Sequence, residues 1–488
     1  MAYTTVDKST ANFKPIEYTG NGSSNAISTV GFKPDWVILK DQGSAYSAYK
    51  YDSIRGATKR LLTDSATTEG TLAEGLKTFD TNGFTMGTDN GANDNSGTIT
   101  ALSWLAGGTA PSLTYKVVVV SDSGNKYRFR NSADNATFGA SAVTLDLQEG
   151  GTYTFDVSDS TMNSHPFVIG TAANSSEYST GVTYKLDGVT KTYSQYTSGF
   201  SAATTRQLII TVPASAPALY YWCSQHSGMG GAINTNSLHG SSNFDGTIQS
   251  VVSNNSNAGF SIVKWAGDDN EASTVGHGLG SKVNMIYTQE INGGDWNRVW
   301  QTGMTGDAYN IFTNNTNTER AAVSDGHVKN LDNTLNFGFE SSTSNVAAVN
   351  QSGINNIAYV FKSVPGFSRF GVYQLVNNND NTFVYTGFRP SMLLIKNLDD
   401  VEKWYFTDTA QKLYNPHGAG DFCAINAAES NSTATSGVNA TIDLLSNGFK
   451  VRATNTSSGE IGFGTRKYLF WAFGQSLVGS NNVPATAR

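Results

Sequence analysis

The sequence predicts an all-β protein made of three repeated β-sandwich domains and one inserted β-barrel. Apolar residues almost never recur with a helical period, so no long amphipathic helix is expected. Short β-branched and aromatic runs are bounded by Gly, Asn, Asp and Ser, a pattern typical of sandwiches and barrels. An internal repeat is the third observation, because the same landmarks recur three times in the same order.

Each copy of the repeat has an apolar strand after a glycine turn, a second strand after another glycine turn, and an aromatic closing strand. The three sets are GFKPDWVILK, NGFTMG and ALSWLAG; GLGSKVNMIY, NFGFES and AYVFKSV; and GFRPSMLLIK, NGFKVR and LFWAFGQ. The first two landmarks lie 52, 60 and 61 residues apart, counted from Gly31, Gly278 and Gly387. Preserved order with unequal spacing indicates one fold whose loops differ in length. Units of this size are too large for a solenoid, so we expect tandem jelly-roll or lectin-like sandwiches, each with its own core.

These landmarks predict four domains. Residues 1–112 form the first repeat with an N-terminal arm, 237–366 the second, and 367–488 the third with a C-terminal tail. The stretch 113–236 lacks the landmarks but is also rich in predicted strands, so we expect a separate inserted domain there.

The composition excludes several classes of protein. The chain has 488 residues and a net charge of −7, without the basic surface of a nucleic-acid binder. No apolar run approaches the roughly 20 residues that span a bilayer, and MAYTTVDKST resembles no secretory signal, so we expect no membrane insertion. The two cysteines lie far apart, which argues against a disulfide scaffold; Cys423 is expected to be an apolar residue within a strand.

The inserted stretch contains a cluster of soft metal ligands. YYWCSQHSGMGG places Cys223, His226 and Met229 at C-x2-H-x2-M, and MNSHPFVIG supplies His165 upstream. A thiolate, two imidazoles and a weak thioether form the ligand set of a blue-copper site. A short loop brings three of these ligands from one strand end to one ion, and the fourth comes from a neighbouring strand. The alternative is a stable β-module in which Cys223 is only a small buried apolar residue.

Residues 127–236 resemble a cupredoxin through the YRFRN strand, the strand after His165, the LIITVPASAPALYYWC pair and the C-x2-H-x2-M loop. The resemblance implies that His165, Cys223, His226 and Met229 bind copper. One departure is a long polar segment, Thr171–Thr205, which we expect to fold outside the barrel.

Other residues are candidates for binding a ligand. Trp296 and Trp404 each follow a polar acidic loop and are candidates for exposed stacking on sugar rings, but for each one a place in the core or at an interface is the stronger alternative. Trp36 lies in an apolar strand and is expected in the core. His239 and His277 are expected to be solvent-facing turn residues. Asp residues recur before the second landmark in all three copies, which favours turn formation over a glycosidase pair, so no enzyme is expected.

The repeats resemble the tandem β-sandwich domains of structural virion proteins from tailed, particularly marine, bacteriophages. The matching elements are GFKPDWVILKD, YDSIRGATKRL, FDTNGFTMG, the GFSRFGVYQ…FVYTGFRPSMLLIKN run, DLLSNGFK and the terminal NNVPATAR, and YYWCSQHSGMGG belongs to the inserted domain. The resemblance implies a tail fibre, a head fibre or a capsid decoration protein.

We therefore expect a non-enzymatic virion protein, made in the host cytoplasm and assembled into the particle with other virion proteins, as a homotrimer. It would serve particle assembly and attachment to a host surface or glycan. The alternative is a copper protein with a redox or metal-storage role. A polysaccharide-degrading tailspike is a third possibility without a carboxylate pair to support it.

Overall fold

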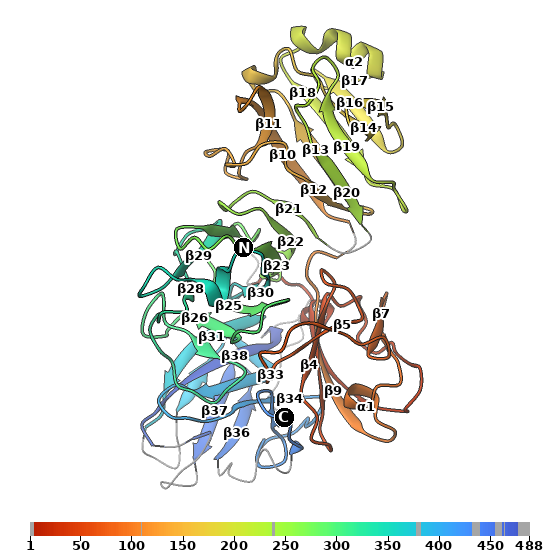
Figure 1. Ribbon diagram of the computed structural model, residues 1–488. Coiled ribbons are helices and arrows are strands. Elements are labelled where there is room, and N and C mark those ends of the chain that lie inside the picture. The colour runs from red at the N-terminus through yellow and green to blue at the C-terminus, as the bar shows by residue number, and fades with distance from the viewer. Residues whose placement is uncertain are drawn as a thin grey trace. The chain divides into compact units, whose positions relative to one another are not determined.

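The computed structural model describes residues 4–108, 110–236, 240–376, 382–431, 440–453, 461–462 and 464–476. The chain is mostly β and forms two compact units. Unit 1 contains residues 1–106, 254–272 and 279–488, and unit 2 contains residues 107–253 and 273–278. Figure 1 shows the strands of both units. The predicted domain boundaries stay predictions.

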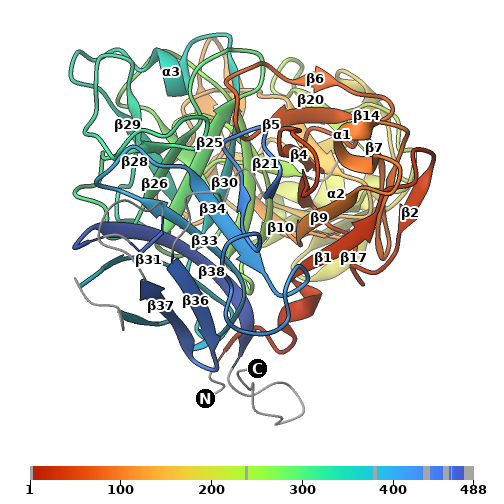
Figure 2. The same ribbon diagram turned by 90° about the horizontal axis from the view of Figure 1, so that it is seen from below.

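The described residues of unit 1 form three large sheets, one for each repeat, with the same strand order. The first runs β1 (Phe13–Thr19), β9 (Thr98–Trp104), β3 (Trp36–Asp41), β4 (Tyr49–Asp52), β5 (Lys59–Leu62) and β6 (Gly70–Thr71). The second includes β23 (Phe260–Ala266), β30 (Asn355–Phe361), β25 (Met285–Glu290), β26 (Arg298–Gln301) and β27 (Ile311–Phe312). The third runs β31 (Ser368–Gln374), β38 (Lys467–Ser476), β33 (Phe388–Asn397), β34 (Trp404–Asp408) and β35 (Cys423–Ala424). Figure 2 labels strands of all three sheets, among them β9, β30 and β38.

Smaller strand groups accompany these sheets. They are β2 (Asn25–Ile27), β8 (Gly83–Met86) and β7 (Leu76–Asp80); β28 (His327–Lys329) with β29 (Asn336–Glu340); and β32 (Phe383–Tyr385), β37 (Gly448–Ala453) and β36 (Ala440–Leu445). The helical elements of unit 1 are short: η1 (Ser9–Ala11), α1 (Asn90–Asn93) and α3 (Ala347–Asn350). In the described part of the chain no helix is both long and apolar enough to cross a membrane.

The continuous apolar runs of the first landmark are explained by burial on both faces of the sheet. Successive side chains of a strand point to opposite faces. In β3, Trp36 and Ile38 belong to one buried cluster, and Val37 and Leu39 belong to another. The equivalent strand β33 divides its side chains between two clusters in the same alternating way.

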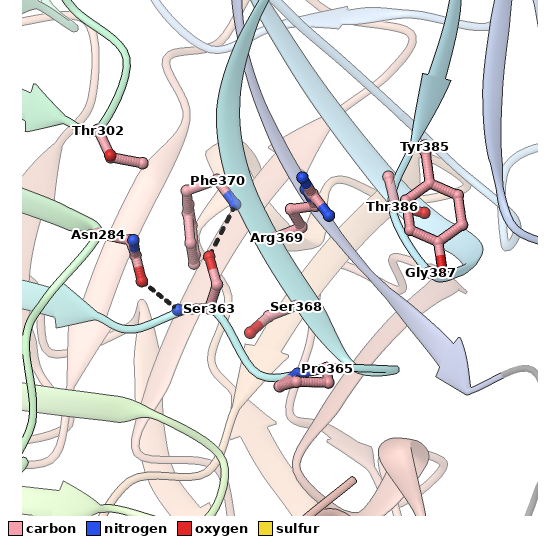
Figure 3. A pocket seen from close by; sticks show the side chains of 10 residues that line it. All are labelled: Asn284, Thr302, Ser363, Pro365, Ser368, Arg369, Phe370, Tyr385, Thr386 and Gly387. Carbon is pink, nitrogen blue, oxygen red and sulfur yellow. Dashed lines mark hydrogen bonds between the residues drawn. The ribbon is translucent and has the colours of Figure 1, made fainter. Parts of the chain in front are cut away.

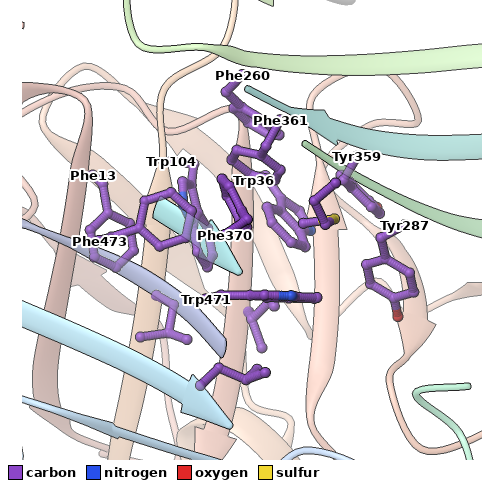
Figure 4. Packing of buried hydrophobic residues seen from close by; sticks show 14 of the residues in the cluster. Phe13, Trp36, Trp104, Phe260, Tyr287, Tyr359, Phe361, Phe370, Trp471 and Phe473 are labelled. Atoms are coloured by element: carbon purple, nitrogen blue, oxygen red, sulfur yellow. The ribbon is translucent and has the colours of Figure 1, made fainter. Parts of the chain in front are cut away.

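One of these clusters is shared by all three repeats, which differs from our expectation that each repeat would have a separate core. Its rings meet across the repeats (Figure 4): Trp36 stacks on Tyr359 at 4.2 Å between centroids, and Phe13 lies 4.8 Å from Phe473. Phe361, from the second repeat, lies 5.5 Å from Phe473 of the third. Each large sheet therefore buries one face against the other two repeats, a packing that the apolar pattern of a single repeat does not reveal.

Hydrogen bonds close the three repeats into a ring. From the first repeat, Lys40 donates to the carbonyl of Ala427 in the third, at 3.2 Å. Lys396 occupies the equivalent strand position in the third repeat and donates to Thr316 O of the second, at 3.1 Å. The second repeat completes the ring through Asn297, whose amide lies 3.3 Å from Thr63 O of the first.

Unit 2 is a sandwich of two open sheets, and its described residues contain no closed barrel, so the expected barrel was wrong. One sheet runs β11 (Asn125–Phe129), β10 (Ser112–Ser121), β13 (Thr152–Asp156), β18 (Arg206–Thr211), β16 (Val182–Leu186) and β17 (Val189–Lys191). The other runs β12 (Leu145–Gln148), β20 (Ala232–Asn236), β19 (Leu219–Cys223), β14 (Phe167–Ala172) and β15 (Ser175–Glu177). A common core fills the sandwich, in which Phe155 stacks on Phe167 with ring centroids 4.8 Å apart.

The polar segment Thr171–Thr205 does not fold outside unit 2 as expected. Its strand β16 pairs with β18 inside the first sheet. After β17 the segment forms α2 (Tyr193–Gly199) and η3 (Phe200–Ala202), and these helices place Tyr196 and Phe200 in the core. The segment therefore adds apolar packing to the sandwich.

The two ends of the long segment of unit 2, residues 107–253, meet. The amide of Gly107, at the start of this segment, donates to the hydroxyl of Ser253, at its end, at 3.0 Å. The remaining elements of this unit are η2 (Ser160–Met162), β21 (Ser241–Asn243), the first part of β22 (Ser250–Asn255) and β24 (Thr274–Gly276).

Candidate metal centre

The predicted ligands His165, Cys223 and His226 come together at one edge of unit 2. Strand pairing explains why His165 and Cys223, 58 positions apart in the sequence, become neighbours. Phe167, at the start of β14, is opposite Cys223, at the end of β19. His165 precedes β14 by two residues, and His226 lies in the loop after β19.

The separations within this group fit one metal ion. Cys223 Sγ lies 3.6 Å from His226 Nδ1 and 3.9 Å from His165 Nδ1, and the two Nδ1 atoms are 3.1 Å apart. Atoms bound about 2.0–2.3 Å from one ion in trigonal or tetrahedral geometry lie about 3.3–3.8 Å from one another. The group could therefore hold a metal ion with small adjustments of the side chains.

The three ligands differ in exposure. Cys223 is buried, His165 is 9% exposed, and His226 is exposed at the surface. Burial, followed by the proximity of His226, lowers the pKa of His165 below its ordinary value. The neutral imidazole, which is the metal-binding form, is therefore favoured at this position.

Neighbouring residues hold His165 in place, and the sequence analysis did not identify them. Tyr127 donates its hydroxyl hydrogen to the backbone carbonyl of His165 at 2.9 Å, and Asn125 Nδ2 lies 3.4 Å from His165 Nε2. Burial, with a smaller contribution from Cys223, raises the pKa of Tyr127 well above its ordinary value. Both residues belong to the strand NKYRF, which is the edge strand β11 of the six-stranded sheet of unit 2. The position of polar residues in this strand is the sequence signal that could have identified them.

The loop from β19 to β20 is fixed at several points. Gly228 N donates to the Asn174 side chain at 2.9 Å, and Met229 O accepts from Tyr127 N at 2.9 Å. A side chain at Gly230 would place its Cβ 1.8 Å from the Tyr221 carbonyl oxygen, so this close approach requires glycine. Met229 is buried and belongs to the same core cluster as Cys223.

The two tryptophans proposed for glycan contact have different environments. Trp404 is fully buried, which contradicts its candidacy for glycan contact and agrees with the alternative of a core residue: its indole N–H donates to Phe312 O of the second repeat at 2.8 Å. Trp296 is 38% exposed, with its ring against Phe312 and the guanidinium of Arg320 5.1 Å from its centroid.

The remaining candidates are placed as follows. Trp36 is buried, as expected, and Cys423 is a fully buried strand residue, also as expected. His277 is buried rather than solvent-facing, and burial lowers its pKa to about 4. His239 lies outside the described residues.

A known family matches most of the chain. The family described as "Domain of unknown function (DUF7483)" matches residues 8–128 and 233–476. The chain belongs to this family. The interval between the two matched segments, 129–232, contains His165, Cys223, His226 and Met229, so the group that could hold a metal ion lies in a part of unit 2 that the family match does not include. No curated protein and no solved structure matches the chain.

Proposed function

We propose that the protein is a non-enzymatic structural component of a bacteriophage particle, serving assembly and attachment to a host surface or glycan. The supporting observation is the aromatic core shared by three repeats of identical strand order. Such a core joins the repeats into one cooperative body because no repeat can separate without exposing large aromatic rings to water. This construction suits a protein that must keep its shape outside the cell.

We further propose that the repeats are jelly-roll or lectin-like sandwiches and that unit 2 is cupredoxin-like. On this proposal the protein is a tail fibre, a head fibre or a capsid decoration protein. A homotrimer is proposed as the assembled form. Light scattering coupled to gel filtration would test it, since the 52.0 kDa chain and a particle of three times that mass are readily distinguished.

Analysis of purified particles tests the virion assignment. We expect mass spectrometry to find the protein at a stoichiometry of many copies per particle, and cryo-electron microscopy to show density for three adjoining sandwiches at one repeated position. Absence of the protein from purified infectious particles would contradict the proposal, whatever the behaviour of the metal group.

A second function is supported by the geometry of His165, Cys223 and His226. We propose that this group binds copper, with Met229 supplying a weak thioether ligand, in a redox or metal-storage role. Thiolate and imidazole ligands suit both common oxidation states of copper, and copper when bound would supply one-electron exchange. The exposure of His226 supports the proposal, because an ion bound there would lie near the surface of unit 2.

The chain provides a matched control for this test, because its second cysteine, Cys423, is also free and buried but belongs to unit 1. Titration of the intact protein with Cu(II) is expected to produce a blue thiolate-to-copper absorption band. Cys223→Ser should abolish the band, and Cys423→Ser should leave it unchanged. A blue band that survives Cys223→Ser, or no copper binding by the folded wild-type protein, would contradict the copper assignment.

A further inference from the structure

A pocket in unit 1, between the second and third repeats, has unused hydrogen-bond donors and an exposed aromatic ring. Its volume is about 470 Å³, and its walls come from the loops beside β25 and β26 and from β31 and the end of β32 (Figure 3). None of the ten residues that line it is acidic. Arg369 is the one charged residue among them, so the local charge is positive and favours an acceptor-rich ligand.

Arg369 provides the positive charge of this pocket. It is exposed, and its guanidinium lies 5.8 Å from the centroid of the Tyr385 ring. Among the residues that the structure describes, no carboxylate pairs with it. An arginine held beside an aromatic ring keeps its planar fork of N–H groups available for two parallel bonds to a carboxylate.

Two further donors face the same space. The Oδ1 atom of Asn284 accepts from Ser363 N at 2.7 Å, which fixes the amide group and leaves its NH2 without an acceptor among the described residues. The hydroxyl of Thr302 also has no hydrogen-bond partner in the described part of the chain, although its backbone N–H donates to Asn284 O. In Figure 3, Arg369 lies between these two residues and Tyr385.

Tyr385 gives the pocket an exposed aromatic ring, since its side chain is 49% exposed. Phe383, two residues earlier on the same strand, is 43% exposed and lies outside the lining of the pocket. Exposed rings beside polar groups present an apolar surface for the C–H face of a sugar, while neighbouring donors bind its oxygens. Carboxylate recognition, hydroxyl recognition and stacking thus coincide in one pocket.

The same position in the first repeat does not have these features. Lys14 pairs with Ser103 in the sheet as Arg369 pairs with Ala472, and these partners are equivalent residues of the closing strands. The Lys14 amine donates to Thr29 O at 2.6 Å. Thr29 stands two residues before Gly31, as Tyr385 stands two residues before Gly387, so Thr29 is the counterpart of Tyr385 in the first repeat. At this position, among the described residues of the first and third repeats, only the third therefore combines an unpaired cation, Arg369, with an exposed aromatic ring, Tyr385.

We infer that the pocket around Arg369 and Tyr385 binds an acidic saccharide, a sugar unit that carries a carboxylate, such as a uronic acid of a bacterial surface polysaccharide. The inference rests on the proposed attachment function and specifies its ligand class. The carboxylate pairs with the Arg369 guanidinium, the ring stacks on Tyr385, and Asn284 and Thr302 donate to hydroxyl oxygens.

Calorimetric titration of the intact protein with trigalacturonic acid tests this inference, with cellotriose as the neutral comparison. We expect binding of the acidic sugar only. Arg369→Gln should weaken it by about tenfold or more, because a charge-assisted pair is lost. Tyr385→Ala should weaken it by roughly three- to tenfold. Lys14→Gln, the matched variant in the first repeat, should bind as the wild type does.

Three outcomes would overturn the inference. They are equal binding of the neutral sugar, unchanged affinity in a folded Arg369→Gln variant, and displacement of the sugar by inorganic phosphate at equal concentration, which would indicate a general anion site. Thermal unfolding of each variant establishes that it is folded. Failure here would leave the virion proposal intact, because detection of the protein in purified particles does not depend on sugar binding.

Discussion

The two units of this protein use buried aromatic residues in different ways. In unit 1 the rings of three repeats meet in one cluster, so each large sheet depends on segments far away in the sequence. In unit 2 the aromatic core is enclosed by the unit's own two sheets, and Cys223 and Met229 lie in that core beside the ligand loop. The comparison teaches that repeated sequence does not imply independent domains, and that the non-repeated part is the more self-contained.

Expressing parts of the chain separately should show the largest difference between the two units. We expect residues 110–253 to fold when expressed alone, because their core is complete. Residues 367–488 alone should not fold, because the rings of Trp404, Trp471 and Phe473 would lose their cover. Dispersion in two-dimensional NMR spectra measures both results. A well-folded isolated third repeat would show that the shared core is dispensable.

Removal of one central ring should affect all of unit 1. Trp36→Ala removes the contacts with Tyr359 and Trp104 and should lower the free energy of unfolding of unit 1 by about 3–5 kcal/mol. Urea unfolding followed by fluorescence measures the change. The matched variant Phe155→Ala removes a ring from the core of unit 2, and its cost should fall on that unit. Equal effects of both variants on both units would contradict the contrast.

Acid should destabilise unit 1 through a buried histidine of the third repeat. Burial lowers the pKa of His417 to about 4, and its Nδ1 lies 2.8 Å from the Thr407 hydroxyl. The unfolded chain therefore binds the proton more readily, and stability is lost as the pH falls from about 6.5 towards 4, by roughly 3 kcal/mol at most. Unfolding free energies at pH 7.5 and 4.5 should differ less in His417→Gln than in the wild type. An identical difference would exclude His417 as a source of acid sensitivity.

The smallest expected effect distinguishes the two tryptophans that the sequence analysis grouped together. Trp404→Phe keeps a ring but leaves Phe312 O without its donor, which should cost about 1–3 kcal/mol. The same change at the partly exposed Trp296 should cost about 0.5 kcal/mol or less. Thermal or urea unfolding of the two variants measures both. A larger cost at Trp296 would reverse this ranking.

The sequence predicted those features that depend on local pattern. The runs DWVILK and MLLIK are strands buried on both faces, and His165, Cys223 and His226 come together because strand pairing brings Phe167 opposite Cys223. It could not predict what covers a second buried face, since that depends on packing between distant repeats. Trp404 was misjudged for this reason, because a carbonyl of the second repeat accepts its N–H. The pocket at Arg369 was missed because it exists only where two repeats adjoin.

The meeting of Gly107 and Ser253 has an evolutionary consequence. The family match includes the first and last parts of the segment between them, residues 107–128 and 233–253, and leaves out 129–232. Because the entry and exit points touch, an exchange within 129–232 would leave the flanking chain in place. Relatives in the family are then expected to differ in this interval while keeping the ring of three repeats. The residues that could hold a metal ion would then vary among relatives, whereas the aromatic core shared by the three repeats would be kept.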